Sequence, residues 1–144
     1  MNLKNAKLAV IGMGYVGLPL ALEFAKKINV IGFDINHSRI DNLNKYYDET
    51  NEVTSIDIKN TKNLKFTTKI EDIKECNVYI VTVPTPIKKN KLPDLGSLIK
   101  ASKMISKIIN RGDFIIYEST VYPGATEEVC IPILEKKSKL RLNY

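Results

Sequence analysis

Short apolar runs alternate with amphipathic stretches along this chain of 144 residues. Five runs have the length and the β-branched content of buried strands, and most are followed by apolar residues at helical spacing. The predicted strands cover residues 7–11, 30–34, 65–67, 78–83 and 114–118. The predicted helices cover residues 16–25, 36–45, 55–60, 94–109 and 126–137.

Local signals indicate where several helices begin or bend. Asn36 is placed to cap the helix that follows it, and Thr68 with Glu71 has the spacing of a capping box for a brief helix. Ile56 is the expected apolar anchor of the short helix at residues 55–60. Pro132 has no amide hydrogen, so it should kink or shorten the last helix.

The alternation of strands and helices predicts an α/β fold with a Rossmann-like, doubly wound parallel sheet in the strand order 3-2-1-4-5. No linker or repeat divides residues 1–144, which are expected to form one domain. The strand at 114–118 would be an edge of the sheet, and residues 140–144 would be a tail with no partner element. Because open strand edges pair readily, we expect either self-association through this edge or a tail that covers it.

A glycine motif follows the first strand and carries the clearest functional signal. It reads Gly12-Met13-Gly14-Tyr15-Val16-Gly17. In a G-x-G-x-x-G turn the first glycine makes the tight turn, the second lets a pyrophosphate approach the backbone, and the third lets the helix pack against the strand. Asp34 lies at the end of the second strand, 20 residues after Gly14, where an acid binds a ribose. The chain is therefore expected to bind a dinucleotide.

Two further polar stretches fall where predicted strands end. Val83-Pro84-Thr85-Pro86 stops the fourth strand abruptly, and Ser119-Thr120 follows the fifth. The carboxyl ends of parallel strands meet at one edge of the sheet, which is where open α/β folds bind ligands. Both stretches are therefore expected beside the glycine motif.

Composition excludes several other classes of function. The net charge is +6, but the lysines are scattered and no aromatic-basic platform accompanies them, which argues against nucleic-acid binding. The cysteines, Cys76 and Cys130, are too few for a disulfide framework, and with the single histidine, His37, they have no metal-ligand spacing, so no metal is expected. No apolar run has the length of a membrane span, and residues 1–5 leave no room for a signal peptide, so a cytoplasmic protein is expected.

Three of these motifs together resemble the UDP-glucose/GDP-mannose dehydrogenase family. They are Gly12-Met13-Gly14-Tyr15-Val16-Gly17-Leu18-Pro19-Leu20, Val83-Pro84-Thr85-Pro86 and Glu118-Ser119-Thr120-Val121. The last continues as Tyr122-Pro123-Gly124, with Thr126-Glu127-Glu128 after it, and is most similar to the UDP-N-acetylhexosamine 6-dehydrogenases of Vi-polysaccharide and O-antigen type.

The resemblance implies an oxidoreductase that takes the C6 alcohol of a UDP-N-acetylhexosamine to the uronic acid in two NAD-dependent steps, for capsule or other surface polysaccharide. In the family a cysteine of a later domain holds the aldehyde, and neither Cys76 nor Cys130 occupies that motif. Residues 1–144 are thus expected to be the NAD-binding, N-terminal part of a longer enzyme. Such a part would be inactive alone, would leave most UDP-sugar contacts to the remainder, and would belong to a homo-oligomer.

The resemblance also implies roles for individual residues. The pyrophosphate would lie on the glycine motif, the ribose on Asp34 and the adenosine along Arg39. The full set of implied cofactor residues is Gly12, Met13, Gly14, Tyr15, Val16, Gly17, Asp34, Arg39, Val83, Pro84, Thr85, Ser119 and Thr120. Thr120 is the one residue expected near the reacting atoms, where it would position water or substrate.

Two other classes of protein share part of this pattern. A non-enzymatic Rossmann nucleotide sensor would have the same glycine motif and Asp34, but it has no need of the motifs at 83–86 and 118–121. A hydroxyacid dehydrogenase related to the phosphogluconate enzymes has a similar glycine loop, but not the Tyr15–Pro19 run. The Asp34 carboxylate favours NAD over NADP because it repels a 2′-phosphate, and Arg39 could soften that preference.

Overall fold

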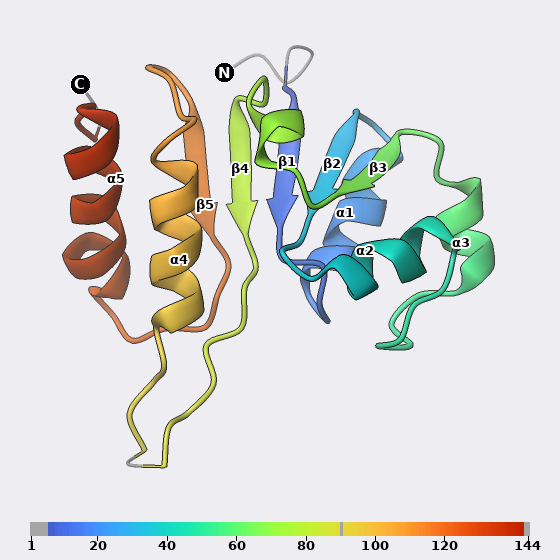
Figure 1. Ribbon diagram of the computed structural model, residues 1–144, viewed down its shortest axis with the longest axis horizontal. Coiled ribbons are helices and arrows are strands. Elements are labelled where there is room, and N and C mark those ends of the chain that lie inside the picture. The colour runs from blue at the N-terminus through green and yellow to red at the C-terminus, as the bar shows by residue number, and fades with distance from the viewer. Residues whose placement is uncertain (1–5, 90, 143–144) are drawn as a thin grey trace.

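The computed structural model describes residues 6–89 and 91–142, and within them it confirms the predicted α/β fold (Figure 1). All strand pairs are parallel, and the sheet order is β3-β2-β1-β4-β5. The strands are β1 (Leu8–Ile11), β2 (Val30–Phe33), β3 (Leu64–Thr67), β4 (Val78–Val81) and β5 (Phe114–Tyr117). The expectation of no leader at residues 1–5 lies outside the described residues.

The helices connect the strands and enclose the sheet. The α-helices are α1 (Gly17–Ala25), α2 (His37–Asn44), α3 (Ser55–Asn60), α4 (Gly96–Ile105) and α5 (Ile131–Ser138). A 3₁₀ turn, η2, covers Ile70–Ile73, and a π-helical turn, η3, covers Thr126–Cys130 and leads into α5. No helix among the described residues combines the length and the apolar character that crossing a membrane requires.

The core has two layers because successive side chains of a strand face opposite sides of the sheet. Leu8 and Val10 of β1 pack in a cluster with α1, α2 and α3, whereas Ala9 and Ile11 pack in a second cluster with α4 and α5. All four side chains are buried. A strand that is apolar on both faces is the pattern of the centre of a parallel sheet, which agrees with the central position of β1.

The helix boundaries agree only partly with the local signals. Asn36 caps α2 as predicted, its side chain accepting a hydrogen bond from the amide of Arg39 at 3.3 Å. Pro132 also acts as predicted, because it lies in the first turn of α5 and the helix before it is a separate π turn. The capping prediction for Thr68 was wrong. It is the hydroxyl of Thr67 that accepts a hydrogen bond from the amide of Lys69, at 3.0 Å.

The anchor of α3 was also assigned wrongly. Ile56 is 68% exposed, and Ile58 is the residue that enters the core, at 4%. Both isoleucines are apolar and two positions apart, so in so short a helix the sequence pattern does not distinguish them. The capping box at Thr54 and Asp57 sets the helix phase and thereby the buried face.

Strand β5 is an edge of the sheet, as predicted, and it is partly exposed. Phe114 and Ile116 keep 48% and 40% of their surface accessible. Residues 140–142, part of the predicted tail, line a hollow of about 480 Å³ together with β5 and α5. The tail thus lies near the edge without burying Phe114 and Ile116, and self-association through β5 stays a prediction.

The approach of α1 to the first turn is close enough to demand glycine. Gly12 has φ +99°, and a Cβ on Gly17 would collide with the carbonyl oxygen of Gly12 and with the hydroxyl of Thr82. By contrast, a Cβ on Gly14 would meet no atom within 4 Å. The third glycine of the motif is therefore required by the fold itself, whereas the second leaves open space.

We expect Gly17→Ala to lower the free energy of unfolding by about 3 kcal/mol, because the added methyl group overlaps backbone atoms that cannot move freely. Gly14→Ala is the matched control and should change stability by less than about 0.5 kcal/mol. Urea denaturation of the three proteins measures both values. Equal unfolding free energies of the two variants would contradict the close approach of α1 to the first turn.

Candidate cofactor-binding site

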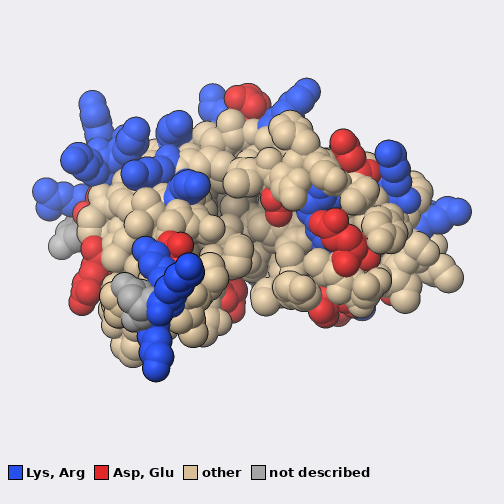
Figure 2. Space-filling view, turned by 60° about the horizontal axis from the view of Figure 1, so that its bottom comes forward, with Lys and Arg blue, Asp and Glu red and all other residues tan. Residues whose placement is uncertain are grey.

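A cavity of about 590 Å³ opens where β1, β2 and β4 end. Figure 2, which brings this edge of the sheet forward, shows a hollow near the centre of the molecule, with Lys and Arg side chains gathered to its left. Seven of the predicted cofactor residues line the cavity: Gly12, Met13, Gly14, Asp34, Arg39, Val83 and Pro84. Their assembly agrees with a ligand site at the carboxyl edge of the strands.

Other residues line the cavity without having been predicted. They are Ile11, Phe33, Ile35, Asn36, Glu49, Thr50, Thr82, Ser97, Lys100, Ala101 and Met104. Ile35 and Asn36 directly follow Asp34, so their position could have been inferred; Glu49 and Lys100 come from a loop and a helix with no motif. The remaining predicted residues lie outside this lining: Tyr15, Val16, Gly17, Thr85, Ser119 and Thr120.

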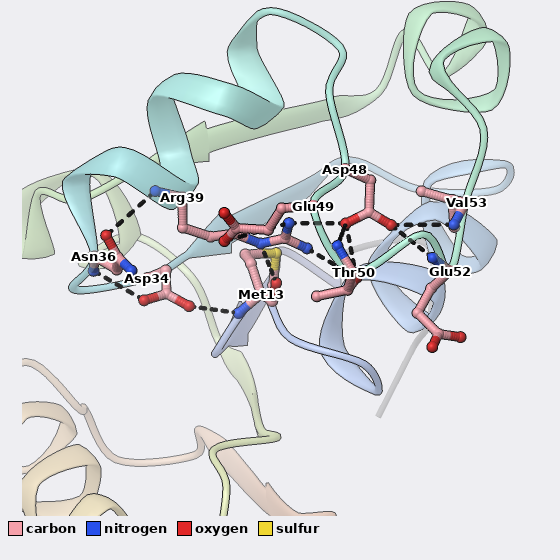
Figure 3. Close-up of polar contacts among 9 residues, drawn as sticks. All are labelled: Met13, Asp34, Asn36, Arg39, Asp48, Glu49, Thr50, Glu52 and Val53. Carbon is pink, nitrogen blue, oxygen red and sulfur yellow. Dashed lines mark hydrogen bonds and ion pairs between the residues drawn. The ribbon is translucent and has the colours of Figure 1, made fainter.

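The turn between β1 and α1 is held from both sides at Met13 (Figure 3). Its amide donates to Oδ2 of Asp34 at 2.8 Å, and its carbonyl oxygen accepts from Nε of Arg39 at 2.7 Å. Thr82 holds the preceding residue, its hydroxyl lying 2.8 Å from the carbonyl oxygen of Gly12. Side chains from three different segments therefore preorganise the glycine turn.

The start of α1 is suited to bind an anion. Val16 occupies the N-cap position without a capping side chain, and the first turn contains no acidic residue. The amide of Leu18 donates to the carbonyl oxygen of Gly14 at 3.2 Å, and Pro19 has no amide hydrogen. What this turn offers an anion is therefore mainly the positive end of the helix dipole. With open space at Gly14, this arrangement fits a phosphate group.

Asp34 is positioned by two backbone amides. Oδ2 accepts from Met13, and Oδ1 accepts from the amide of Asn36 at 2.9 Å. Each carboxylate oxygen can accept more than one hydrogen bond, so Asp34 retains acceptor capacity toward the cavity that it lines. This is the geometry required to bind ribose hydroxyls.

Arg39 is buried, with only 4% of its side chain exposed. In addition to its bond to Met13, its Nη1 forms an ion pair with Oδ1 of Asp48 at 2.8 Å, and Nη2 donates to the hydroxyl of Thr50 at 3.4 Å. The guanidinium thus joins α2, the glycine turn and the loop after α2. Its charge is compensated inside the protein by Asp48, whose side chain is 1% exposed.

The loop after α2 is built around the carboxylate of Asp48. Oδ1 accepts from the hydroxyl and the amide of Thr50 at 2.7 and 3.0 Å, and Oδ2 accepts from the amides of Glu52 and Val53 at 2.8 and 3.1 Å. Burial by itself raises the pKa of Asp48, but hydrogen bonds from Thr50, Arg39 and Val53 outweigh it and lower the pKa to about 2. The carboxylate is therefore held in its ionised form.

The two motifs after β4 and β5 are linked to each other. The hydroxyl of Ser119 donates to the carbonyl oxygen of Val83, and that of Thr85 donates to the carbonyl oxygen of Thr120, both at 2.6 Å. These hydroxyls therefore hold the strand-end loops side by side.

Neither cysteine is suited to act as a nucleophile. Cys76 and Cys130 are buried. Burial raises the pKa of Cys76 to about 11 and also raises the pKa of Cys130. Because the thiolate is the reactive form, both thiols should be inert at neutral pH.

Comparison with known proteins identifies the same type of domain. The model of the UDP-glucose/GDP-mannose dehydrogenase family, NAD binding domain, matches residues 6–144. The chain is 57% identical over 141 residues to a UDP-N-acetyl-D-glucosamine 6-dehydrogenase of Pseudomonas aeruginosa and 53% identical over 142 residues to one of Salmonella typhi. These alignments cover 98% and 99% of this chain but 33% of each relative.

Two solved structures have the same fold. The UDP-D-ManNAc dehydrogenase of Pyrococcus horikoshii superposes with a TM-score of 0.87 at 34% sequence identity, over 95% of this chain and 34% of that one. The GDP-mannose dehydrogenase of Pseudomonas aeruginosa superposes with a TM-score of 0.85 at 26% identity, over 93% of this chain and 33% of that one. This chain thus spans about a third of the length of the proteins that it matches.

The role of Asp48 can be tested by the change of the unfolding free energy with pH in the acid range. A carboxyl whose pKa falls from about 3.9 in the unfolded chain to about 2 in the folded protein stabilises the fold by about 2 kcal/mol. That contribution is complete above about pH 5 and is lost as the pH falls toward 2. We therefore expect the difference in unfolding free energy between wild type and Asp48→Asn to shrink by about 2 kcal/mol between pH 7 and pH 2.

Chemical denaturation across this range provides the measurement. Asp41→Asn is the control, since it removes a carboxylate from an exposed position of α2 and should change stability at pH 7 by less than about 0.5 kcal/mol. If the difference in unfolding free energy between wild type and Asp48→Asn did not change with pH, a stabilising charge at Asp48 would be ruled out.

Proposed function

The chain belongs to the UDP-glucose/GDP-mannose dehydrogenase family, as its NAD-binding domain, and on this premise we propose that it serves an enzyme that oxidises C6 of a UDP-N-acetylhexosamine. The observation that carries the proposal is the convergence of Gly14, Asp34 and the loop at Val83 on one cavity. NAD, when bound, accepts a hydride from the alcohol. The product would be a uronic acid for a surface polysaccharide.

Each group in the cavity has a task in this proposal. Gly14 and the uncapped start of α1 hold the pyrophosphate, and Asp34 binds the ribose of the adenosine. Val83 and Pro84 form the wall across from Asp34, and Arg39 acts from within the protein by holding the turn at Met13. A preorganised site avoids much of the entropic cost of ordering a loop on binding.

Residues beyond the cavity lining complete the proposal. Ser119 and Thr120 follow β5, which lies beyond β4 in the sheet order, and both form hydrogen bonds with the loop at 83–85. We assign them to the nicotinamide end, with Thr120 positioning water or substrate. Tyr15 and Val16, which are 70% and 54% exposed, contribute through their backbone at the pyrophosphate.

For the sugar we propose UDP-N-acetyl-D-glucosamine. The support is the identity to the two relatives named for this substrate, 57% and 53%, against 40% to the UDP-N-acetyl-D-mannosamine dehydrogenase of Campylobacter jejuni. The two sugars differ in configuration at C2, so the assignment predicts discrimination at that carbon.

We expect this chain to bind NAD⁺ and to bind it at least tenfold more weakly after Asp34→Ala, because the variant loses both the ribose acceptor and the partner of the Met13 amide. Isothermal titration calorimetry of wild type and variant provides the measurement, with circular dichroism to verify that both are folded.

Asp41→Asn on the exposed side of α2 is the control and should bind NAD⁺ like wild type. Equal binding by wild type and Asp34→Ala would contradict the assignment of Asp34 to the ribose. A folded wild-type chain that binds no NAD⁺ would contradict the proposed function.

We expect no NADH from UDP-N-acetyl-D-glucosamine and NAD⁺ with this chain alone, because it spans a third of the relatives' length and most UDP-sugar contacts are assigned to the remainder. Its two cysteines are buried and protonated, so neither can hold the aldehyde for the second oxidation. Replacing the matching third of the Pseudomonas aeruginosa relative by this chain should give a protein that forms NADH, followed by absorbance at ~340 nm. An inactive but folded, NAD⁺-binding hybrid would favour the alternative, a nucleotide sensor.

A further inference from the structure

The loop after α2 presents a second acid to the cavity. Glu49 follows Asp48 directly and lines the cavity together with Asp34. Its Oε1 lies 3.9 Å from Nη1 of Arg39, and 45% of its side chain is exposed. In Figure 3 the Glu49 side chain is turned back along Arg39, toward the end of the network where Asn36 and Asp34 lie.

The position of Glu49 is determined by its buried neighbour. Asp48 is held by the ion pair with Arg39 and by the amides of Thr50, Glu52 and Val53. The backbone of residues 48–53 therefore wraps around one carboxylate. The backbone of Glu49 is thereby fixed beside the cavity.

The same network makes the guanidinium of Arg39 unavailable for binding a phosphate. Arg39 lines the cavity, yet its Nε is used by Met13 and its charge is compensated by Asp48. With that pair neutral, the remaining charges of the cavity lining are the carboxylates of Asp34 and Glu49 and the ammonium of Lys100 on α4. The lining is then negative by one charge, and Glu49 accounts for that excess.

We propose that Glu49 is a specificity determinant of this site: anchored by the Asp48–Arg39 pair, it excludes dinucleotides that carry a 2′-phosphate and so restricts the site to NAD. The inference rests on the proposed function, because it assigns the ribose end of the cavity to the adenosine of the cofactor. Asp34 recognises the ribose hydroxyls directly, whereas Glu49 acts through its charge. Glu49 therefore affects NADP⁺ and leaves the binding of NAD⁺ nearly unchanged.

Two substitutions, one that removes the negative charge at position 49 and one that reverses it, test this role. Glu49→Gln should tighten the binding of NADP⁺ roughly threefold to tenfold, the effect of one partly exposed carboxylate on a nearby phosphate, and Glu49→Lys should tighten it further. Both variants should bind NAD⁺ within about twofold of wild type. The difference between Glu49→Gln and wild type should diminish between roughly 0.05 and 1 M salt, because ions screen exposed charges.

Glu52→Gln is the matched control. Glu52 is an exposed acid of the same loop whose side chain is not part of the cavity lining, and in Figure 3 it points away from the network. This variant should change the affinity for neither dinucleotide. Titration calorimetry with NAD⁺ and NADP⁺ on the four proteins gives all the affinities.

The results separate the two hypotheses. An unchanged NADP⁺ to NAD⁺ ratio in Glu49→Gln and Glu49→Lys, with normal NAD⁺ binding, overturns the role of Glu49 and leaves the proposed function standing. An equal effect of Glu52→Gln also overturns it, since the cause would then be the net charge of the chain. Absence of NAD⁺ binding by the folded wild type overturns both hypotheses.

Discussion

The contact between the start of α1 and the end of β1 is the constraint on which the rest of the structure depends. A side chain on Gly17 would overlap the carbonyl oxygen of Gly12 and the hydroxyl of Thr82. The helix can approach so closely only because that position has no Cβ. This approach directs the start of α1 to the edge where the strands end, and the cavity opens at the same edge. The requirements of packing and of anion binding are thus met by one turn.

The turn is also held by long-range polar contacts, and these explain why it can be preformed. Asp34 accepts a hydrogen bond from the amide of Met13, and Arg39 donates one to the carbonyl oxygen of Met13. Both backbone polar groups of this residue are therefore satisfied before a ligand arrives. Burying the Arg39 cation is costly, and the ionised Asp48 offsets that cost only because backbone amides satisfy its remaining lone pairs. The ion pair therefore positions the glycine turn, and the ionised carboxylate of Asp48 also stabilises the fold.

The different roles of the charged residues in the site follow from this arrangement. Asp34 faces the ligand, Arg39 supports the turn from inside, and Glu49 is presented by the loop that Arg39 and Asp48 hold. The same domain occurs in dehydrogenases about three times as long as this chain. A preformed dinucleotide site avoids much of the entropic cost of ordering its own loops when the ligand binds.

The sequence alone determined the strands and their order, the three glycines, the N-cap at Asn36 and the acid at Asp34, because each depends on neighbours within a few residues or on the fixed handedness of parallel crossovers. Only the tertiary structure decided that Ile58 rather than Ile56 enters the core, that Arg39 pairs with Asp48, and that Glu49 lines the cavity. These outcomes depend on which side chains the folded chain brings together across many residues. Periodicity and spacing carry no signal for such pairings, since a buried partner and a solvated charge look the same along the chain.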